Sequence, residues 1–217
     1  MNRFKIMKRQ PGKIICYSGK ARNEGFTLIE LLVVSGILFI LFGLSIAASV
    51  KGKELAKRSG CLSNLRQIGI ATLIYVDENG SYPPAWVDST KRWMDLIKPY
   101  VSKKSNVYIC PSDKKKLSVV WDPEIFLSYG YNVFRFSDQE KCFWYGVKAQ
   151  TVLRPSGVII FSDCTPGKYY CGGGSVFKEP VTDVDYRHLK KSFVAAFCDG
   201  HTEAKTKTQQ IEWDVSK

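Results

Sequence analysis

An apolar run from Phe26 to Ala48 that contains one carboxylate, Glu30, constrains this chain of 217 residues more than any other feature. A helix over this run is long enough to cross a bilayer. A carboxylate at membrane depth costs about 2.5–3.5 kcal/mol on insertion scales, so it persists where a positive charge compensates it. Cleavage after Gly25 would create that charge, because the new α-amine of Phe26 would face Glu30 of a neighbouring copy in a medium of low dielectric constant.

The residues before this run have the charge pattern of a cytoplasmic end. Residues 1–25 contain seven Lys and Arg residues against one acidic residue, Glu24. This positive excess predicts that the N-terminus stays in the cytoplasm and that the C-terminal portion is exported. No Ala-x-Ala cleavage site follows Ala48, so we expect the apolar run to remain in the mature protein. Met7 is an alternative start.

The segment Gly25-Phe26-Thr27-Leu28-Ile29-Glu30 resembles the processing site of the type IV prepilin family, which includes the pseudopilins of type II secretion. The resemblance implies that a prepilin peptidase cuts between Gly25 and Phe26 and methylates the new amine. It also implies that Glu30 is an assembly contact between subunits. The alternative is an ordinary signal anchor in which the Glu30 side chain extends to the membrane interface.

Six cysteines lie beyond the apolar run, and export would place them in an oxidising compartment. We therefore expect at least one disulfide, although six thiols allow many pairings. Cys164 and Cys171 are the favoured pair, because they bracket a turn-forming segment, residues 165–168. The chain has no Cys-x-x-Cys motif and only two histidines, so we expect no metal centre built on these residue types.

The length of the chain allows one exported globular domain after the apolar run. We divide the sequence into a basic leader (1–25), a transmembrane and assembly helix (26–48), an exported continuation of that helix (49–80) and an exported globular α+β domain (81–217). Apolar residues recur every three or four positions from Leu55 to Val76, which predicts one helix from Phe26 to about Asp77. Gly80 and the prolines that follow it should end this helix.

The rest of the chain predicts a second helix and several short strands. The second helix should run from Thr90 or Lys91 to about Val101. Strands are expected at residues 106–110, 117–121, 127–133, 143–149, 158–163, 193–198 and 201–205. Asp199-Gly200 predicts a type I′ turn between the last two strands. The expected fold is α+β and pilin-like, with the long N-terminal helix packed on a small antiparallel sheet.

Downstream segments extend the resemblance to a large bacterial group of pseudopilin-like proteins. They are Cys61-Leu62-Ser63-Asn64-Leu65-Arg66-Gln67-Ile68-Gly69, Gly80-Ser81-Tyr82-Pro83-Pro84, Cys110-Pro111-Ser112-Asp113 and Ser128-Tyr129-Gly130-Tyr131-Asn132. That group ends in His, nine residues, then Asp-Gly. Here ten residues separate His188 from Asp199-Gly200. The resemblance implies a structural role for His188, Asp199 and Gly200.

No enzyme motif accompanies these residues, so we expect no catalytic residue and no enzymatic activity. The formal net charge is +12, and half of it leaves with the leader. Because no recognition motif accompanies the lysines, we expect no nucleic-acid partner. Calcium is the one cofactor left open, since major pseudopilins of similar architecture hold it near the C-terminal sheet. Its oxygen ligands here would be Asp163, Asp183, Asp185 and Asp199.

These observations favour a structural subunit of the bacterial inner membrane with its C-terminal domain in the periplasm. A prepilin peptidase would process it. Other pilin-like subunits and the inner-membrane assembly machinery would then incorporate it into a type II secretion pseudopilus or a type IV pilus-like filament. The alternative is a membrane-tethered exported module that binds a polysaccharide, secreted cargo or DNA and does not enter a filament.

Overall fold

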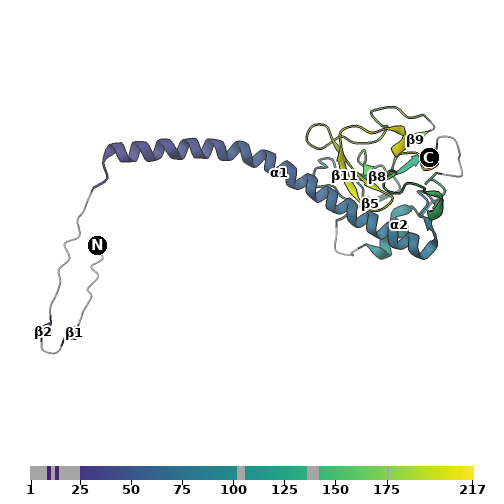
Figure 1. Ribbon diagram of the computed structural model, residues 1–217, viewed down its shortest axis with the longest axis horizontal. Coiled ribbons are helices and arrows are strands. Elements are labelled where there is room, and N and C mark those ends of the chain that lie inside the picture. Colours follow the sequence, from purple (N-terminus) through teal and green to yellow (C-terminus); the bar gives the residue numbers. More distant parts are fainter. Residues whose placement is uncertain (1–8, 11–12, 15–24, 102–105, 136–141, 175) are drawn as a thin grey trace. The chain divides into compact units, whose positions relative to one another are not determined.

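The computed structural model describes residues 9–10, 13–14, 25–101, 106–135, 142–174 and 176–217 (Figure 1). The side chains of residues 9–10, 13–14 and 44–48 are not included. The chain divides into two compact units, Met1–Ala47 and Ala48–Lys217. Helix α1 (Leu28–Asn79) has its first part in one unit and its second part in the other.

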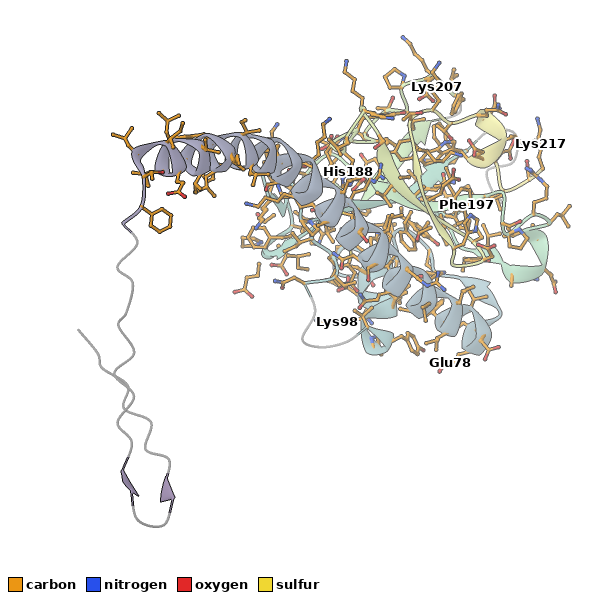
Figure 2. All side chains as sticks on the ribbon, turned by 60° about the vertical axis from the view of Figure 1, so that its left-hand side comes forward. Glu78, Lys98, His188, Phe197, Lys207 and Lys217 are labelled. Atoms are coloured by element: carbon orange, nitrogen blue, oxygen red, sulfur yellow. A yellow bond between two sulfur atoms is a disulfide. The ribbon has the colours of Figure 1, made fainter. Side chains whose placement is uncertain are left out.

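The first unit consists of a short strand pair and an apolar helix. Strands β1 (Arg9–Gln10) and β2 (Lys13–Ile14) pair antiparallel. The large apolar side chains from Phe26 to Phe42 stand on all sides of α1 and are 49% to 85% exposed (Figure 2). Within the described residues, no helix has a stretch both long and apolar enough to span a membrane. The expected span ran to Ala48, and the side chains of residues 44–48 lie outside this description, as does most of the expected leader.

In the second unit, α1 ends where the sequence predicts. The Gly80 N–H donates to the Val76 carbonyl at 2.8 Å, and Gly80 has a φ of +69°, a conformation that favours glycine at a helix end. Leu65 and Ile68 are fully buried, which confirms the predicted apolar repeat. Leu55 is 46% exposed, so the repeat begins to pack on the domain only after this residue.

A five-stranded sheet forms the centre of the second unit, in the order β11-β10-β8-β6-β9. Its strands are β6 (Tyr129–Phe134), β8 (Ile159–Asp163), β9 (Tyr170–Gly174), β10 (Phe193–Phe197) and β11 (Thr202–Lys205). Every neighbouring pair is antiparallel except β6 and β9, which are parallel. The expected antiparallel sheet is therefore a mixed one, with β9 as the added strand.

Strand β9 was not predicted because three of the five residues in its sequence, Tyr-Cys-Gly-Gly-Gly, are glycines, which are depleted in strands. Its glycines are explained by packing. A Cβ on Gly172 would lie 2.0 Å from the ring of Phe134, and Gly172 has a φ of +73°. Only a residue without a side chain lets Phe134 cover this strand, and that contact involves residues far apart in the sequence.

The smaller elements flank this sheet. They are β3 (Ser81–Tyr82) paired with β7 (Val147–Lys148), β4 (Ser118–Val119) paired with β5 (Asp122–Phe126), α2 (Trp93–Ile97), and the 3-10 turns η1 (Lys98–Tyr100), η2 (Ala149–Thr151) and η3 (Gln210–Glu212). The predicted second helix is shorter than expected, because Pro99 cannot continue an α-helix. The predicted strand at residues 106–110 is wrong, since this segment forms a turn in which the Ile109 N–H donates to the Asn106 carbonyl.

The sheet separates two groups of buried side chains. Successive residues of β10 alternate between them, because side chains along a strand point to opposite faces. Val194 and Ala196 join the group that contains Leu65 and Ile68 of α1. Phe193, Ala195 and Phe197 join a second group that contains Trp213 near the C-terminus. Helix α1 therefore packs on one face of the sheet, as expected.

The predicted hairpin between β10 and β11 is confirmed, but its turn differs from the prediction. The Gly200 N–H donates to the Phe197 carbonyl at 2.9 Å, and the Phe197 N–H donates to the His201 carbonyl at 3.0 Å. Within the loop of residues 198–200, Gly200 has a positive φ, +85°, and Asp199 does not. This pattern is that of a three-residue loop with a left-handed glycine, rather than a type I′ turn.

Candidate functional site

The expected cleavage site, Gly25-Phe26, lies exposed just before helix α1. A Cβ added to Gly25 would meet no atom within 4 Å. The fold of this chain therefore does not itself require a glycine at this position. A requirement for a small residue at position 25 must come from a molecule that binds the segment.

Glu30 has a second role, which the sequence analysis missed. The backbone N–H and the hydroxyl of Thr27 donate to Glu30 Oε2 at 2.9 and 2.8 Å, and the Glu30 N–H contacts the Thr27 hydroxyl oxygen at 3.3 Å. These reciprocal bonds form a capping box, which satisfies backbone N–H groups that a helix start leaves open. The signal was present in the sequence as Thr27-x-x-Glu30. The Glu30 carboxylate thus stabilises the start of its own helix.

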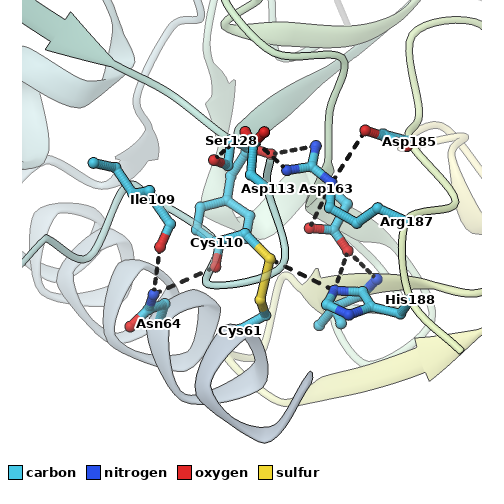
Figure 3. Close-up of a disulfide and its surroundings, with 12 residues drawn as sticks. Cys61, Asn64, Ile109, Cys110, Asp113, Ser128, Asp163, Asp185, Arg187 and His188 are labelled. Atoms are coloured by element: carbon cyan, nitrogen blue, oxygen red, sulfur yellow. Dashed lines mark hydrogen bonds and ion pairs between the residues drawn. A yellow bond between two sulfur atoms is a disulfide. The ribbon is translucent and has the colours of Figure 1, made fainter. Parts of the chain in front are cut away.

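In the second unit, a disulfide joins helix α1 to the segment that follows residue 105 (Figure 3). The bond links Cys61 to Cys110, with 5.1 Å between their Cα atoms. One turn further along α1, the Asn64 side-chain amide donates to the Ile109 carbonyl at 3.0 Å. The expectation of at least one disulfide is confirmed, and this bond holds the helix on the domain.

The favoured pair, Cys164–Cys171, is not disulfide-bonded, and that prediction is wrong. Both residues are buried free thiols. The Cys164 thiol donates to the Tyr170 carbonyl at 2.9 Å, and the Cys171 Sγ lies 3.0 Å from the Ser162 hydroxyl. Burial, together with the contact between the two thiols, raises the pKa of Cys164. The intervening turn does bring the cysteines together, but spacing alone could not reveal these other partners.

Arg187 lies at the centre of a buried ionic cluster beside the disulfide (Figure 3). Its Nη1 is 3.1 Å from Asp113 Oδ2, and its Nε is 3.2 Å from Asp185 Oδ2 and 3.9 Å from Asp163 Oδ1. Its Nη2 donates to the Ser128 carbonyl at 3.3 Å and to the Cys164 carbonyl. The side chain is only 6% exposed. One guanidinium thus joins three segments of the domain that are distant in the sequence.

His188 extends this cluster to the disulfide. Its Nε2 lies 3.0 Å from Asp163 Oδ2 and 3.7 Å from Cys110 Sγ. The same Asp163 oxygen accepts the Val194 N–H of β10 at 2.7 Å. Within the described residues, the other ring nitrogen, Nδ1, is buried without a hydrogen-bond partner. His188 therefore connects β8 and β10 to the point where α1 is cross-linked.

The carboxylates of this cluster differ in their electrostatics. Burial opposes the ionisation of Asp113, but hydrogen bonds from Ser128 and the Lys116 N–H, together with the charge of Arg187, outweigh burial and lower the pKa of Asp113. Burial raises the pKa of Asp185, against the attraction of Arg187. Asp113 is therefore the carboxylate that its surroundings hold ionised, and its charge offsets that of Arg187.

A surface cavity of about 440 Å³ opens beside the cluster. Its lining consists of Ser112, Asp113, Lys114, Lys115, Thr165, Pro166, Asp185 and Arg187. Because the charged groups at its inner wall already pair with one another, the cavity offers no uncompensated charge from Arg187 or Asp113 to a ligand.

The residues of the C-terminal signature, His188 and Asp199-Gly200, have separate partners in the fold. His188 pairs with Asp163, whereas Asp199 Oδ1 accepts the His201 N–H at 3.0 Å within its own turn. Gly200 is needed for packing as well as for its backbone conformation. A Cβ added to it would lie 2.9 Å from Leu73 of α1, and a Cβ on Gly69 would lie 3.4 Å from the Gly200 Cα. The turn therefore contacts α1 through two glycines.

The four carboxylates considered for calcium do not gather into one group. Asp163 and Asp185 meet at Arg187, Asp183 pairs with Lys168 at 2.9 Å, and Asp199 lies in the β10–β11 turn. Across the described residues, one group of three potential metal ligands comes together, formed by Cys61, Cys110 and His188. Its two sulfur atoms are bonded to each other, so they are not available as thiolates.

Comparison with known proteins bears on the N-terminal segment. A family model described as the prokaryotic N-terminal methylation motif matches residues 20–46, which include Gly25, Phe26 and Glu30. No curated protein and no solved structure shows detectable similarity to the chain. The matched segment therefore indicates a prepilin-type leader followed by a methylation motif, and it supports a type IV pilin-like chain.

Proposed function

We propose that this chain is a pilin-like structural subunit, cut between Gly25 and Phe26, methylated on Phe26 and assembled through its N-terminal helix. The filament would be a type II secretion pseudopilus or a related type IV pilus-like fibre. The match of the N-terminal methylation motif to residues 20–46 is the observation that carries this proposal. A structural role also fits the second unit, where the buried charged residues around Arg187 pair with one another.

The exposed apolar surface of the first unit supports assembly. The large apolar side chains from Phe26 to Phe42 are at least 49% exposed, and an apolar surface of this extent marks an interaction site. Lipid would cover it before assembly, and the helices of neighbouring subunits would cover it afterwards. The basic leader would keep the N-terminus in the cytoplasm, with the second unit in the periplasm.

In this proposal, Glu30 acts between copies of the chain. The hydrogen bonds from Thr27 reach Oε2, so the other oxygen of this exposed carboxylate can accept a hydrogen bond from outside the chain. After cleavage, the amine of Phe26 in an incoming subunit would provide a positive charge. The attraction within such an ion pair is strong in lipid, because a medium of low dielectric constant screens it less than water does.

Intact-mass measurement with N-terminal sequencing of the membrane-extracted protein tests the processing step. We expect the mature chain to begin at N-methylated Phe26 and a Gly25→Leu variant to keep its leader. Because the fold leaves space for either residue, a loss of cleavage in this variant would come from the peptidase and not from misfolding. A mature chain that begins at Met1, at Met7 or after Ala48 would contradict the proposal.

Two substitutions of Glu30 separate the assembly contact from the helix cap. Glu30→Gln keeps a residue that can complete the capping box but removes the charge, whereas Glu30→Ala removes both. We expect both variants to be processed and inserted normally and both to give weaker oligomer ladders on crosslinking in the envelope, at matched abundance. If Glu30→Gln assembles like the wild type, the charge is not the contact. Equal ladders and equal filament output for all three proteins would favour the tethered module instead.

A further inference from the structure

A continuous series of aromatic side chains lies at the surface of the second unit, outside the cluster around Arg187. It consists of Trp86, Trp144, Tyr170, Tyr169 and Trp121, and we call it the aromatic ring surface. Successive centroids are 6.4 Å apart from Trp86 to Trp144, 6.2 Å from Trp144 to Tyr170, 5.0 Å from Tyr170 to Tyr169 and 4.7 Å from Tyr169 to Trp121. These residues come from four separate segments of the chain.

The Arg92 guanidinium lies over three of these aromatic side chains. Its guanidinium carbon lies 4.7 Å from the Trp121 centroid, 5.5 Å from that of Tyr169 and 5.9 Å from that of Trp86. Arg92 is 7% exposed, and its Nη1 donates to the Lys91 carbonyl at 3.1 Å. A cation over several ring faces restrains the orientation of each ring. The aromatic ring surface is therefore pre-organised.

Comparison with the other two tryptophans shows that this surface faces outward. Trp93 and Trp213 are fully buried, and their indole N–H groups donate to the Tyr169 carbonyl and the Thr208 hydroxyl. Trp86 is 41% exposed, and Trp121 and Trp144 are half-buried. Within the described part of the chain, no acceptor pairs with the indole N–H groups of these three outer residues. The aromatic ring surface thus offers aromatic faces to a ligand, with indole N–H groups beside them that can donate hydrogen bonds.

The charges around this surface are mixed. Arg135 lies over Trp144, and Lys168 lies over Tyr170 but pairs with Asp183. Exposed Asp88 and Lys91 border the ring next to Trp86. Without the buried Arg92, these groups carry three positive and two negative charges, and Lys168 is already paired. Nucleic-acid binding depends on several cations that contact phosphates, more than this surface leaves unpaired. A neutral polymer with apolar ring faces and hydroxyl groups fits better.

We propose that the aromatic ring surface binds a neutral polysaccharide. A pyranose ring has an apolar C–H face that stacks on an aromatic side chain, and hydroxyl oxygens at its edge that accept N–H bonds. Trp86 and Trp144 would provide the stacking faces, since amphipathic aromatic side chains suit a contact that is apolar on one side and wet on the other. This inference does not depend on filament assembly.

The test uses the full chain in detergent, retained on insoluble cellulose and chitin and titrated with soluble xyloglucan and mannan while its tryptophan fluorescence is followed. We expect the wild type to bind at least one of these polysaccharides. Trp86→Ala and Trp144→Ala should each weaken binding about fivefold to tenfold, the loss expected for one stacked ring. Phe126→Ala is the matched control, because Phe126 is 40% exposed and lies outside the ring; it should bind like the wild type.

Formation of the Cys61–Cys110 disulfide and an unchanged near-UV circular dichroism spectrum would verify that each variant is folded. Failure of the wild type to bind any of the four polysaccharides would overturn the proposal, as would full binding by both tryptophan variants. Single-stranded DNA and a proline-rich peptide serve as competing probes. If one of these probes binds, its binding is lost in Trp86→Ala, and no polysaccharide binds, the surface is a site for that class of polymer and the proposal is wrong.

Discussion

The two units of this chain place apolar and charged groups in opposite ways. In the first unit, the large apolar side chains from Phe26 to Phe42 are exposed, and the carboxylate of Glu30 is exposed with them. In the second unit, Arg187, Asp113 and Asp163 are buried among side chains that pair with them. The first unit therefore needs partners from outside the chain, whereas the second unit pairs its buried charges internally.

This difference shows which part of the molecule depends on contacts from outside the chain. Exposed apolar surface is costly in water, so the first unit is stable only where lipid or another subunit covers it. The cluster around Arg187 costs free energy for a different reason. Buried charges lose their hydration, and only their partners in the fold offset that loss. Substitutions in the second unit should therefore reduce stability, and substitutions in the first unit should reduce association.

The largest effect is expected from Arg187→Met, which removes the cation and leaves Asp113 and Asp163 buried without it. Breaking a buried ion pair in this way costs about 3–5 kcal/mol. Urea unfolding of the full chain, followed by tryptophan fluorescence, measures the loss, because every tryptophan lies in the second unit. Arg66→Met, at an exposed position on α1, is the control and should change stability by less than about 0.5 kcal/mol. Equal stability of wild type and Arg187→Met would show that the cluster does not hold the domain.

Replacing both Cys61 and Cys110 by serine should destabilise the second unit by up to about 4 kcal/mol. The estimate follows from the unfolded-chain entropy that a crosslink with a sequence separation of 49 removes. Non-reducing peptide mapping of the wild type should recover Cys61 joined to Cys110. Recovery of a Cys164–Cys171 crosslink instead would refute the assignment of the disulfide.

Thr27→Ala should loosen the first turn of α1 by about 1 kcal/mol, because it removes the hydroxyl from the capping box. Amide hydrogen exchange at residues 28–31 of the full chain measures this change. Thr27→Ser keeps a hydroxyl and should exchange like the wild type. The stability of the second unit should not change in either variant. If Thr27→Ala also lowered the stability of the second unit, the two units would be energetically coupled.

The smallest effect concerns pH. The pKa of Asp113 is lowered in the folded chain, so its stabilising contribution is complete above its unfolded pKa and is lost as the pH falls through its lower folded pKa. Asp185 acts in the opposite direction, because its pKa is raised. Asp113→Asn should therefore unfold at lower urea concentration near pH 7 and lose less further stability in acid than the wild type. Asp77→Asn, at an exposed position, should follow the wild-type profile.

The sequence was most informative where a property depends on neighbouring residues. The apolar run, the processing motif, the end of α1 at Gly80 and the hairpin at Asp199-Gly200 could all be predicted, because helix ends and tight turns depend on the few residues that form them. The capping role of Glu30 could have been predicted as well, since Thr27-x-x-Glu30 is a local pattern.

Pairings between distant segments could not be predicted. Strand β9 exists because the Phe134 ring needs the space above Gly172, and its parallel partner β6 lies about 40 residues earlier in the chain. The expected Cys164–Cys171 bond was wrong for a related reason. Proximity in the sequence did bring the two thiols together, but their hydrogen bonds within the core and the pairing of Cys61 with Cys110 depend on the whole fold.

By itself, the sequence determined that this chain has a prepilin-type leader followed by an apolar segment, because hydrophobicity, leader charge and the methylation motif are all properties of consecutive residues. Only the tertiary structure decided what His188 and Gly200 do. His188 pairs with Asp163 rather than with Asp199, and Gly200 lets its turn approach Leu73 of α1. Such roles depend on which surfaces meet when the sheet packs on the helix, and spacing along the chain carries no information about that contact.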